Sequence, residues 1–153
     1  MKPITVYLAG DIASEDRWRP KVVKACEGLN VIFLSPLDNI DYRYSTLKKA
    51  NLSNRVFLHC DYKKIDMADV VFAYVRSCKS RHSGTSAEIG YARSRGKLVL
   101  YVNDMKKTER YLYEFIERTA DEVFNTFPQG IDYLQDYLVE MDYEVKEERD
   151  EQG

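Results

Sequence analysis

The 153-residue sequence has no apolar run approaching the roughly 20 residues that a membrane-spanning helix needs. Its first residues also lack the basic and apolar regions of a signal peptide. An excess of one charge is missing too, because 23 basic and 25 acidic residues leave a net charge of −2. That balance gives no electrostatic basis for binding nucleic acid. We therefore expect a cytoplasmic protein that binds neither nucleic acid nor a membrane.

Cysteine is also scarce. Cys26, Cys60 and Cys78 are odd in number and do not have the spacing of metal ligands. They are typical of reduced thiols in a reducing compartment, and we expect no metal and no other cofactor. The chain has no internal repeat and no linker. We expect one domain over residues 1–141, followed by a frayed, charged tail over residues 142–153.

Short apolar runs alternate with segments of helical spacing along the chain. The expected strands are 4–9, 31–34, 70–75, 98–102 and 122–124. The expected helices are 18–27, 51 or 53 to 67, one helix that contains Glu88, 106–119 and 131–141. Residues 37–50 have no clean period and are expected to form a long loop over a crevice. The alternation predicts an α/β fold with a doubly wound, parallel, five-stranded sheet of the flavodoxin or Rossmann kind.

Within two of these helices, the periodicity predicts which side chains face inward. In the helix over 106–119 the expected inward residues are Tyr111, Leu112, Phe115 and Ile116. In the preceding helix they are Val56, Cys60 and Met67 on one part of the face, and Leu58, Tyr62 and Ile65 on another.

The segment from Ser83 to Ala92 lies between two expected strands, where a β-α-β crossover places a loop and the first turn of a helix. Ligands of open α/β sheets bind beyond the carboxyl ends of the strands, which is where this loop belongs. Glu88 is expected in the first turn. Thr85 and Glu88 fit a capping box, which would make the glutamate structural. Alternatively, the helix dipole keeps the carboxylate ionised so that it can attack an anomeric carbon. The residues alone leave both interpretations open.

Asp61 lies beside the apolar face of the expected helix that ends at Met67. A carboxylate is costly to bury without a partner, so this position favours a functional role. The alternative is that Asp61 points to solvent beside Lys64 or pairs with Lys63.

Three segments, taken in order, resemble the nucleoside 2-deoxyribosyltransferases and their relatives that hydrolyse nucleotide N-glycosidic bonds. They are residues 6–10, 61–71 and 84–97, and the resemblance covers roughly residues 3 to 103. It implies a retaining double displacement on a deoxyribosyl group. In that mechanism Glu88 is the nucleophile, Asp61 is the acid that protonates the departing base, and the Tyr7 hydroxyl positions the nucleophile. Without the resemblance, a core-filling role for Tyr7 would be favoured.

The same resemblance implies a set of substrate contacts. The residues expected to make them are Gly10, Asp11, His82, Ser83, Gly84 and Asn125. Many of the transferases carry an aspartate where this chain has His82, and the nucleotide-hydrolysing relatives carry a serine there. Arg81, His82 and Ser83 would suit a 5′-phosphate, whereas the carboxylate of Asp11 would repel it. The 5′ substituent is therefore left open.

Transferases of this family borrow an asparagine from a neighbouring subunit. Asn125 is the nearest match in this chain, and Asn103 is a weaker one. The 12 tyrosines suit a large core or a subunit interface, and we expect a homodimer or a larger homo-oligomer.

Three other functions compete with deoxyribosyl transfer between nucleobases. The first is hydrolysis of 2′-deoxynucleoside 5′-monophosphates. The second is a phosphoribohydrolase of the cytokinin-activating type, which normally carries Pro-Gly-Gly where this chain has residues 80–83. The third is a non-catalytic nucleotide-sensing module, which would not need Asp61 and Glu88 to converge. A flavin protein is disfavoured, because no loop rich in serine and threonine follows the first strand. The preferred base and acceptor stay open.

Overall fold

The computed structural model describes residues 2–10, 17–36, 54–77 and 82–153. The strands are β1 (Ile4–Gly10), β2 (Val31–Leu34), β3 (Val70–Arg76), β4 (Leu98–Asp104) and β5 (Glu122–Phe124). The helices are α1 (Trp18–Ala25), α3 (Asn54–Met67), α4 (Ser83–Ser94), α5 (Lys107–Arg110), the 3₁₀ turn η1 (Tyr111–Tyr113), α6 (Glu114–Thr119) and α7 (Phe127–Gln152). The predictions made for Asp11, Cys78, Arg81 and the loop over 37–50 fall outside the described residues.

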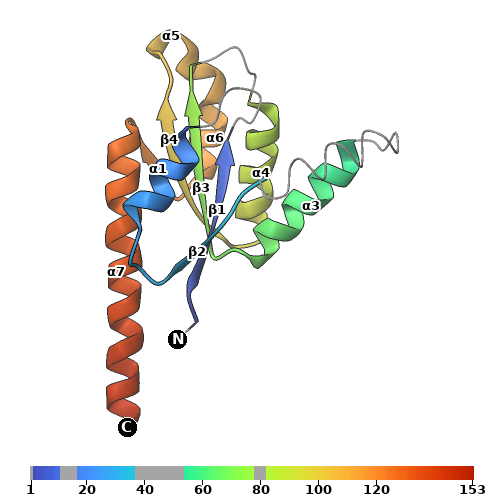
Figure 1. The fold of residues 1–153 in the computed structure, drawn as a ribbon. Coiled ribbons are helices and arrows are strands. Elements are labelled where there is room, and N and C mark those ends of the chain that lie inside the picture. Colours follow the sequence, from blue (N-terminus) through green and yellow to red (C-terminus); the bar gives the residue numbers. More distant parts are fainter. Residues whose placement is uncertain (1, 11–16, 37–53, 78–81) are drawn as a thin grey trace.

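The five strands form one sheet in the order β2-β1-β3-β4-β5, and every pair is parallel. The predicted doubly wound, flavodoxin-like sheet is confirmed. Because all strands run the same way, their carboxyl ends share one edge, which is the upper edge in Figure 1. The order reverses beside β1, since β2 lies on one side of it and β3 on the other. This is the topological switch point, where folds of this kind bind their ligands.

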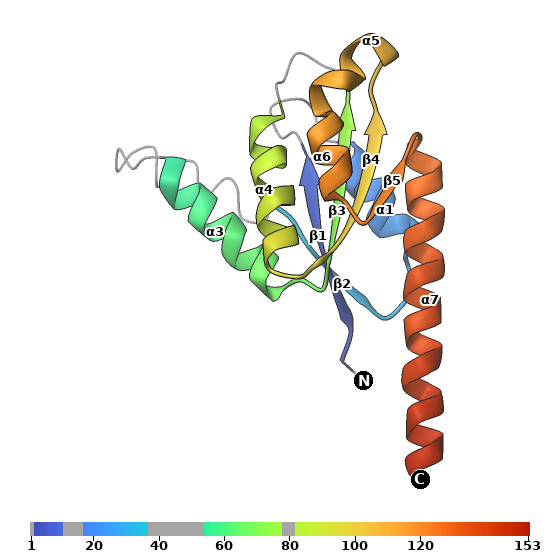
Figure 2. The same cartoon turned by 180° about the vertical axis from the view of Figure 1, so that it is seen from behind.

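Helices cover both faces of the sheet. Helices α1 and α7 lie on one face, and α3, α4 and α6 lie on the other (Figures 1 and 2). Side chains alternate between the faces along each strand. Leu8, Phe72 and Val102 therefore pack under α1 and α7, while Tyr7 and Tyr101 face the opposite layer.

The helix predicted over residues 106–119 is broken into α5, η1 and α6. Three of its four expected inward residues are instead exposed: Tyr111 by 69%, Leu112 by 63% and Phe115 by 85%. Tyr113 is the buried one. A 3₁₀ turn has three residues per turn, so it changes which side chains face the sheet. Met67 was also expected inward, but at the end of α3 it is 68% exposed.

Helix α7 is longer at both ends than the predicted helix over 131–141. It begins behind Thr126, whose Oγ1 accepts a hydrogen bond from the Gln129 amide at 3.4 Å. Leu134 and Leu138 are buried as expected. The prediction of a frayed tail after residue 141 is wrong, because α7 continues to Gln152. Good helix-forming residues and the Lys146–Asp142 pair one turn apart support this extension. Among the described helices, none is both long and apolar enough to span a membrane.

Candidate active site

Strand β1 brings Tyr7 to the centre of the molecule. The side chain is fully buried and faces the layer formed by α3 and α4. Gly10 ends the strand at the carboxyl edge. A Cβ added there would lie 2.6 Å from the Trp18 ring and 3.0 Å from the Tyr74 carbonyl oxygen, so only glycine fits.

Helix α4 begins earlier than the sequence suggested. His82 adopts the left-handed conformation with φ 51°, and its carbonyl oxygen accepts bonds from the Ser86 amide at 3.0 Å and the Ser86 hydroxyl at 2.9 Å. Ser83 is therefore the first helical residue, and Glu88 is the sixth, in the second turn. Of the two interpretations of Glu88, the capping box is wrong, because Thr85 lies inside the helix and is buried.

The local environment of Glu88 works against its ionisation. The residue as a whole is half-buried, but its Oε2 atom is buried. Burial, followed by the charge of Asp61, raises the pKa of Glu88 to about 8. The Tyr7 hydroxyl and the cations of Arg19 and Lys64 oppose this rise and are outweighed. The expected effect of the helix dipole does not prevail, since it falls off within the first turn and Glu88 lies beyond it.

Tyr7 and Glu88 face one another. Burial raises the pKa of the Tyr7 hydroxyl, and the Glu88 charge raises it further. The hydroxyl lies close enough to Glu88 to favour the ionised carboxylate. Even so, neither the hydroxyl nor Oε2 completes a hydrogen bond of normal geometry with any described residue. Buried polar groups are rarely left in this state, and such exceptions require a functional or structural explanation.

Helix α3 brings Asp61 to the same place. Asp61 lies one helical turn before Ile65, which is fully buried against the sheet. It is half-buried, and its charge acts on both Tyr7 and Glu88. Lys64 ties this helix to the end of β2 through a 2.7 Å hydrogen bond from Nζ to the Ser35 carbonyl oxygen. The structure thus brings Tyr7, Asp61 and Glu88 together from three elements at the switch point.

Arg19 is a charged residue of this region that sequence reasoning missed. It lies in α1 and is only 4% exposed. Its Nε donates to the Leu8 carbonyl oxygen at 3.2 Å, and its second guanidinium nitrogen donates to the Gly10 carbonyl oxygen at 2.9 Å. The sequence did contain a signal that Arg19 faces inward, because it precedes the inward residue Val22 by three positions, about one helical turn. The positive charge of Arg19 offsets part of the rise in the pKa values of Tyr7 and Glu88.

The residues predicted to contact the substrate lie in different parts of the structure. Ser83 and Gly84 are exposed in the first turn of α4. His82 is buried, and its Nε2 bonds the Arg76 carbonyl oxygen at 2.9 Å, so its ring secures the turn that precedes α4. Asn125 is exposed just after β5, at the opposite side of the sheet from β2. Within one chain, it is not brought to Tyr7 and Glu88.

Asn103, the weaker candidate for a borrowed amide, is buried under α6. Its Nδ2 donates to Glu117 at 2.8 Å, which is a bond inside the domain. Among the residues that the structure describes, no group of three or more His, Cys, Asp and Glu side chains is placed to hold a metal ion.

A groove of about 940 Å³ runs beside α1 and the edge strand β2. Its walls include Leu8, Arg19, Val31 and Phe33. These strand residues belong to the sheet face opposite Tyr7. The groove therefore adjoins the candidate site through Arg19 but does not contain the Glu88 carboxyl.

Comparisons with known proteins identify the family and the fold of the chain. A family model described as nucleoside 2-deoxyribosyltransferase matches residues 6–149. No relative was found among curated proteins. The solved structures that resemble the chain include a 2-deoxyribosyltransferase from Bacillus psychrosaccharolyticus, with a TM-score of 0.60, 17% identity, and coverage of 86% of this chain and 90% of that one. Another is a 2-desoxiribosyltransferase from Leishmania mexicana, with a TM-score of 0.63, 21% identity, and coverage of 88% and 98%. At these identities the two structures establish a shared fold.

Proposed function

Since the chain belongs to the nucleoside 2-deoxyribosyltransferase family, we propose that it cleaves the N-glycosidic bond of 2′-deoxyribonucleosides and transfers the deoxyribosyl group to another nucleobase. The observation that supports this activity is the convergence of two interacting carboxyl groups and a buried tyrosine hydroxyl at the switch point. Two carboxyl groups with separate duties are what glycosyl transfer with retention requires. A sensing module would have no need for this convergence.

The proposed reaction has two displacements at the same carbon. First, the Glu88 carboxylate attacks C1′ and forms an ester, while the bond from C1′ to the base nitrogen breaks. The bonding electrons leave with the base, which takes a proton from Asp61. In the second step a nitrogen of the incoming base attacks C1′ and gives up its proton to Asp61, and Glu88 departs as a carboxylate. Two inversions give overall retention.

The proposed reaction requires the two carboxyl groups to differ in protonation. The mutual repulsion of two nearby carboxylates favours a pair that shares one proton, whose titration belongs to the pair. In the reactive form the proton is on Asp61 and the charge is on Glu88. The Tyr7 hydroxyl and the Arg19 cation both favour the ionised form of Glu88. Because the pKa of Glu88 is raised to about 8, loss of the shared proton should reduce kcat/KM as the pH rises through this value.

The activity is tested by incubating the protein with deoxyinosine or deoxycytidine plus adenine, and separately with deoxynucleoside monophosphates alone. Chromatography should show deoxyadenosine in the first mixtures. Release of free base from a monophosphate, with water as the acceptor, would instead establish the hydrolase. Binding of nucleotides without cleavage would establish the sensing module.

The role of Glu88 is tested with Glu88→Gln, which keeps the size of the side chain and removes the nucleophilic oxygen. We expect turnover to fall by about a thousandfold or more, and mass spectrometry should detect a deoxyribosyl adduct on the wild-type protein alone. Glu140→Gln, a change on the exposed side of α7, is the matched control and should keep full activity. Near-normal turnover of Glu88→Gln would exclude the covalent mechanism.

We further propose a homodimer or larger homo-oligomer in the cytoplasm. Asn125 lies beyond β4 and β3 from Tyr7, so an Asn125 amide at the site would have to come from a second copy. The free thiols of Cys26 and Cys60 suit a reducing compartment. Sedimentation velocity would measure the assembly directly, and a monomer at working concentration would contradict it.

A further inference from the structure

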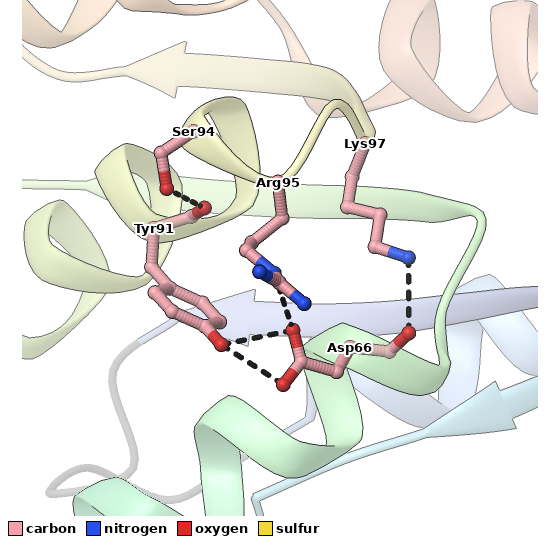
Figure 3. A network of polar contacts seen from close by, with 5 residues as sticks. All are labelled: Asp66, Tyr91, Ser94, Arg95 and Lys97. Carbon is pink, nitrogen blue, oxygen red and sulfur yellow. Dashed lines mark hydrogen bonds and ion pairs between the residues drawn. The ribbon is translucent and has the colours of Figure 1, made fainter.

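Helices α3 and α4 are joined by a second set of side chains close to the candidate catalytic pair. The Tyr91 hydroxyl donates a bifurcated hydrogen bond to the two carboxylate oxygens of Asp66, at 2.8 and 2.9 Å, and Arg95 Nε donates to the same carboxylate at 2.9 Å. The Nζ atom of Lys97 donates to the Asp66 carbonyl oxygen at 2.9 Å (Figure 3). The Tyr62 ring stacks on the Tyr91 ring, with centroids 4.0 Å apart and planes 1° from parallel. We refer to these five residues, Tyr62, Asp66, Tyr91, Arg95 and Lys97, as the α3–α4 clamp.

The clamp and the catalytic pair lie on neighbouring parts of the same two helices. Tyr62 directly follows Asp61 on α3. Tyr91 follows Glu88 by three residues on α4, so the two side chains lie on the same side of that helix. A contact that fixes Tyr62 against Tyr91 therefore also fixes the backbone that carries Asp61 relative to the backbone that carries Glu88.

The position of α3 depends on contacts near its carboxyl end. Ile65 and Ala68 are buried there, and the clamp lies at the same end. Toward its amino-terminal end α3 points away from the sheet (Figures 1 and 2). A small rotation about this attachment would move Asp61, which lies part of the way along the helix.

The clamp is poorly suited to a purely stabilising role. The Arg95 side chain is 56% exposed and that of Asp66 is 36% exposed. Ion pairs of this exposure contribute little to folding. The geometry of this cluster, by contrast, is specific, because one carboxylate accepts hydrogen bonds from a hydroxyl on α4 and from the guanidinium of Arg95, the residue that follows α4.

We propose that the α3–α4 clamp is a positioning device that holds Asp61 at the separation from Glu88 that the reaction needs. The inference rests on the proposed glycosyl transfer and adds positioning residues to it. Its physical basis is the sensitivity of catalysis to geometry, since a displacement of 1 Å costs on the order of a hundredfold in rate.

The test compares Tyr62→Ala, which removes the stacked ring, with Tyr62→Phe, which keeps it. Tyr143→Ala, on an exposed part of α7, is the matched truncation control. We expect Tyr62→Ala to lower kcat by about tenfold to a hundredfold while KM changes by less than about threefold. Tyr62→Phe and Tyr143→Ala should keep the wild-type kcat.

A second readout does not depend on activity. The titratable and charged groups that act on Glu88 are Tyr7 from β1, Asp61 and Lys64 from α3, and Arg19 from α1. If Asp61 moves away, its repulsion weakens and the pKa of Glu88 falls. We expect the carboxyl carbon signal of Glu88 in NMR titrations to shift its midpoint downward by about 0.5 pH unit or more in Tyr62→Ala, and the alkaline limb of kcat/KM should move the same way.

The outcomes separate the inference from the proposed function. An inactive wild-type protein would remove the proposed function, while the NMR titration would still report on the geometry. An active wild type together with equal kcat values and equal Glu88 midpoints in Tyr62→Ala and Tyr62→Phe would overturn the positioning role, whatever the loss of thermal stability.

Discussion

At the scale of single residues, Tyr7 shows how a site can be built at the expense of local bonding. Its hydroxyl is buried beside Glu88, yet it forms no hydrogen bond of normal geometry with a described residue. A buried hydroxyl without a partner costs folding free energy, and its removal is expected to be neutral or stabilising. The same hydroxyl favours the ionised form of Glu88. Stability and activity should therefore respond to it in opposite directions.

Tyr7→Phe tests this opposition. We expect an unchanged or higher thermal midpoint, because the variant deletes only the unpartnered hydroxyl. The kcat should fall by about tenfold to a hundredfold, since the pKa of Glu88 rises further when the hydroxyl is lost and less of the nucleophile is ionised. Differential scanning calorimetry and steady-state kinetics measure the two effects.

Tyr101→Phe is the matched control. Tyr101 is also fully buried, and its hydroxyl likewise completes no hydrogen bond with a described residue, but it is not among the groups that act on Glu88. Its loss should leave kcat unchanged. A Tyr7→Phe protein that is clearly less stable yet fully active would show that the hydroxyl serves the core instead.

At the scale of elements, the packing of α7 against β4 depends on a glycine, Gly130, which has no side chain. Gly130 lies in the first turns of α7, and a Cβ added there would approach Val102 to 2.3 Å and the Phe72 ring to 3.3 Å. Glycine inside a helix costs about 1 kcal/mol relative to alanine. Close contact between the helix and the sheet therefore takes precedence over helix propensity here.

Gly130→Ala should accordingly destabilise the protein, although alanine is the better helix former. Overpacking of this kind costs about 1–3 kcal/mol, measured as the free energy of unfolding in urea. Gly90→Ala on α4 is the control, since a Cβ there meets nothing within 4 Å. It should be neutral or stabilising. A Gly130→Ala protein as stable as Gly90→Ala would mean that α7 shifts on the sheet at no cost.

At the scale of the whole molecule, the raised pKa of Glu88 is linked to folding stability. In the unfolded chain this carboxyl has a pKa near 4.5, and in the fold it is raised to about 8. The folded state therefore binds the proton more tightly. This contribution to stability is fully present below the lower value and is lost as the pH rises through about 8.

The wild-type protein should thus lose stability relative to Glu88→Gln, which stays neutral, as the pH rises. We expect the difference in unfolding free energy to change by on the order of 4 kcal/mol between about pH 5 and pH 9. Urea unfolding of both proteins across this range measures it, and the charges that do not interact with Glu88 cancel in the difference. Parallel stability curves would show that Glu88 titrates normally.

The sequence by itself determined the alternation of strands and helices along the chain and therefore the fold class. Apolar runs such as residues 70–75 and 98–102 are long enough to mark strands buried on both faces of a sheet, and the spacing of Leu134 and Leu138 marks the inner side of α7. The motif around Glu88 also pointed to the carboxyl edge. These signals are local, because they depend on neighbours within a few residues along the chain.

Only the tertiary structure decided how these residues are used. Asp61 and Glu88 are 27 positions apart, and their mutual influence on protonation follows from the packing of α3 beside α4. The burial of Arg19 likewise depends on carbonyl oxygens of another element. The inward direction of the Tyr113 side chain depends on a single 3₁₀ turn. Burial and electrostatic coupling are sums over neighbours distant in sequence, so no local pattern contains them.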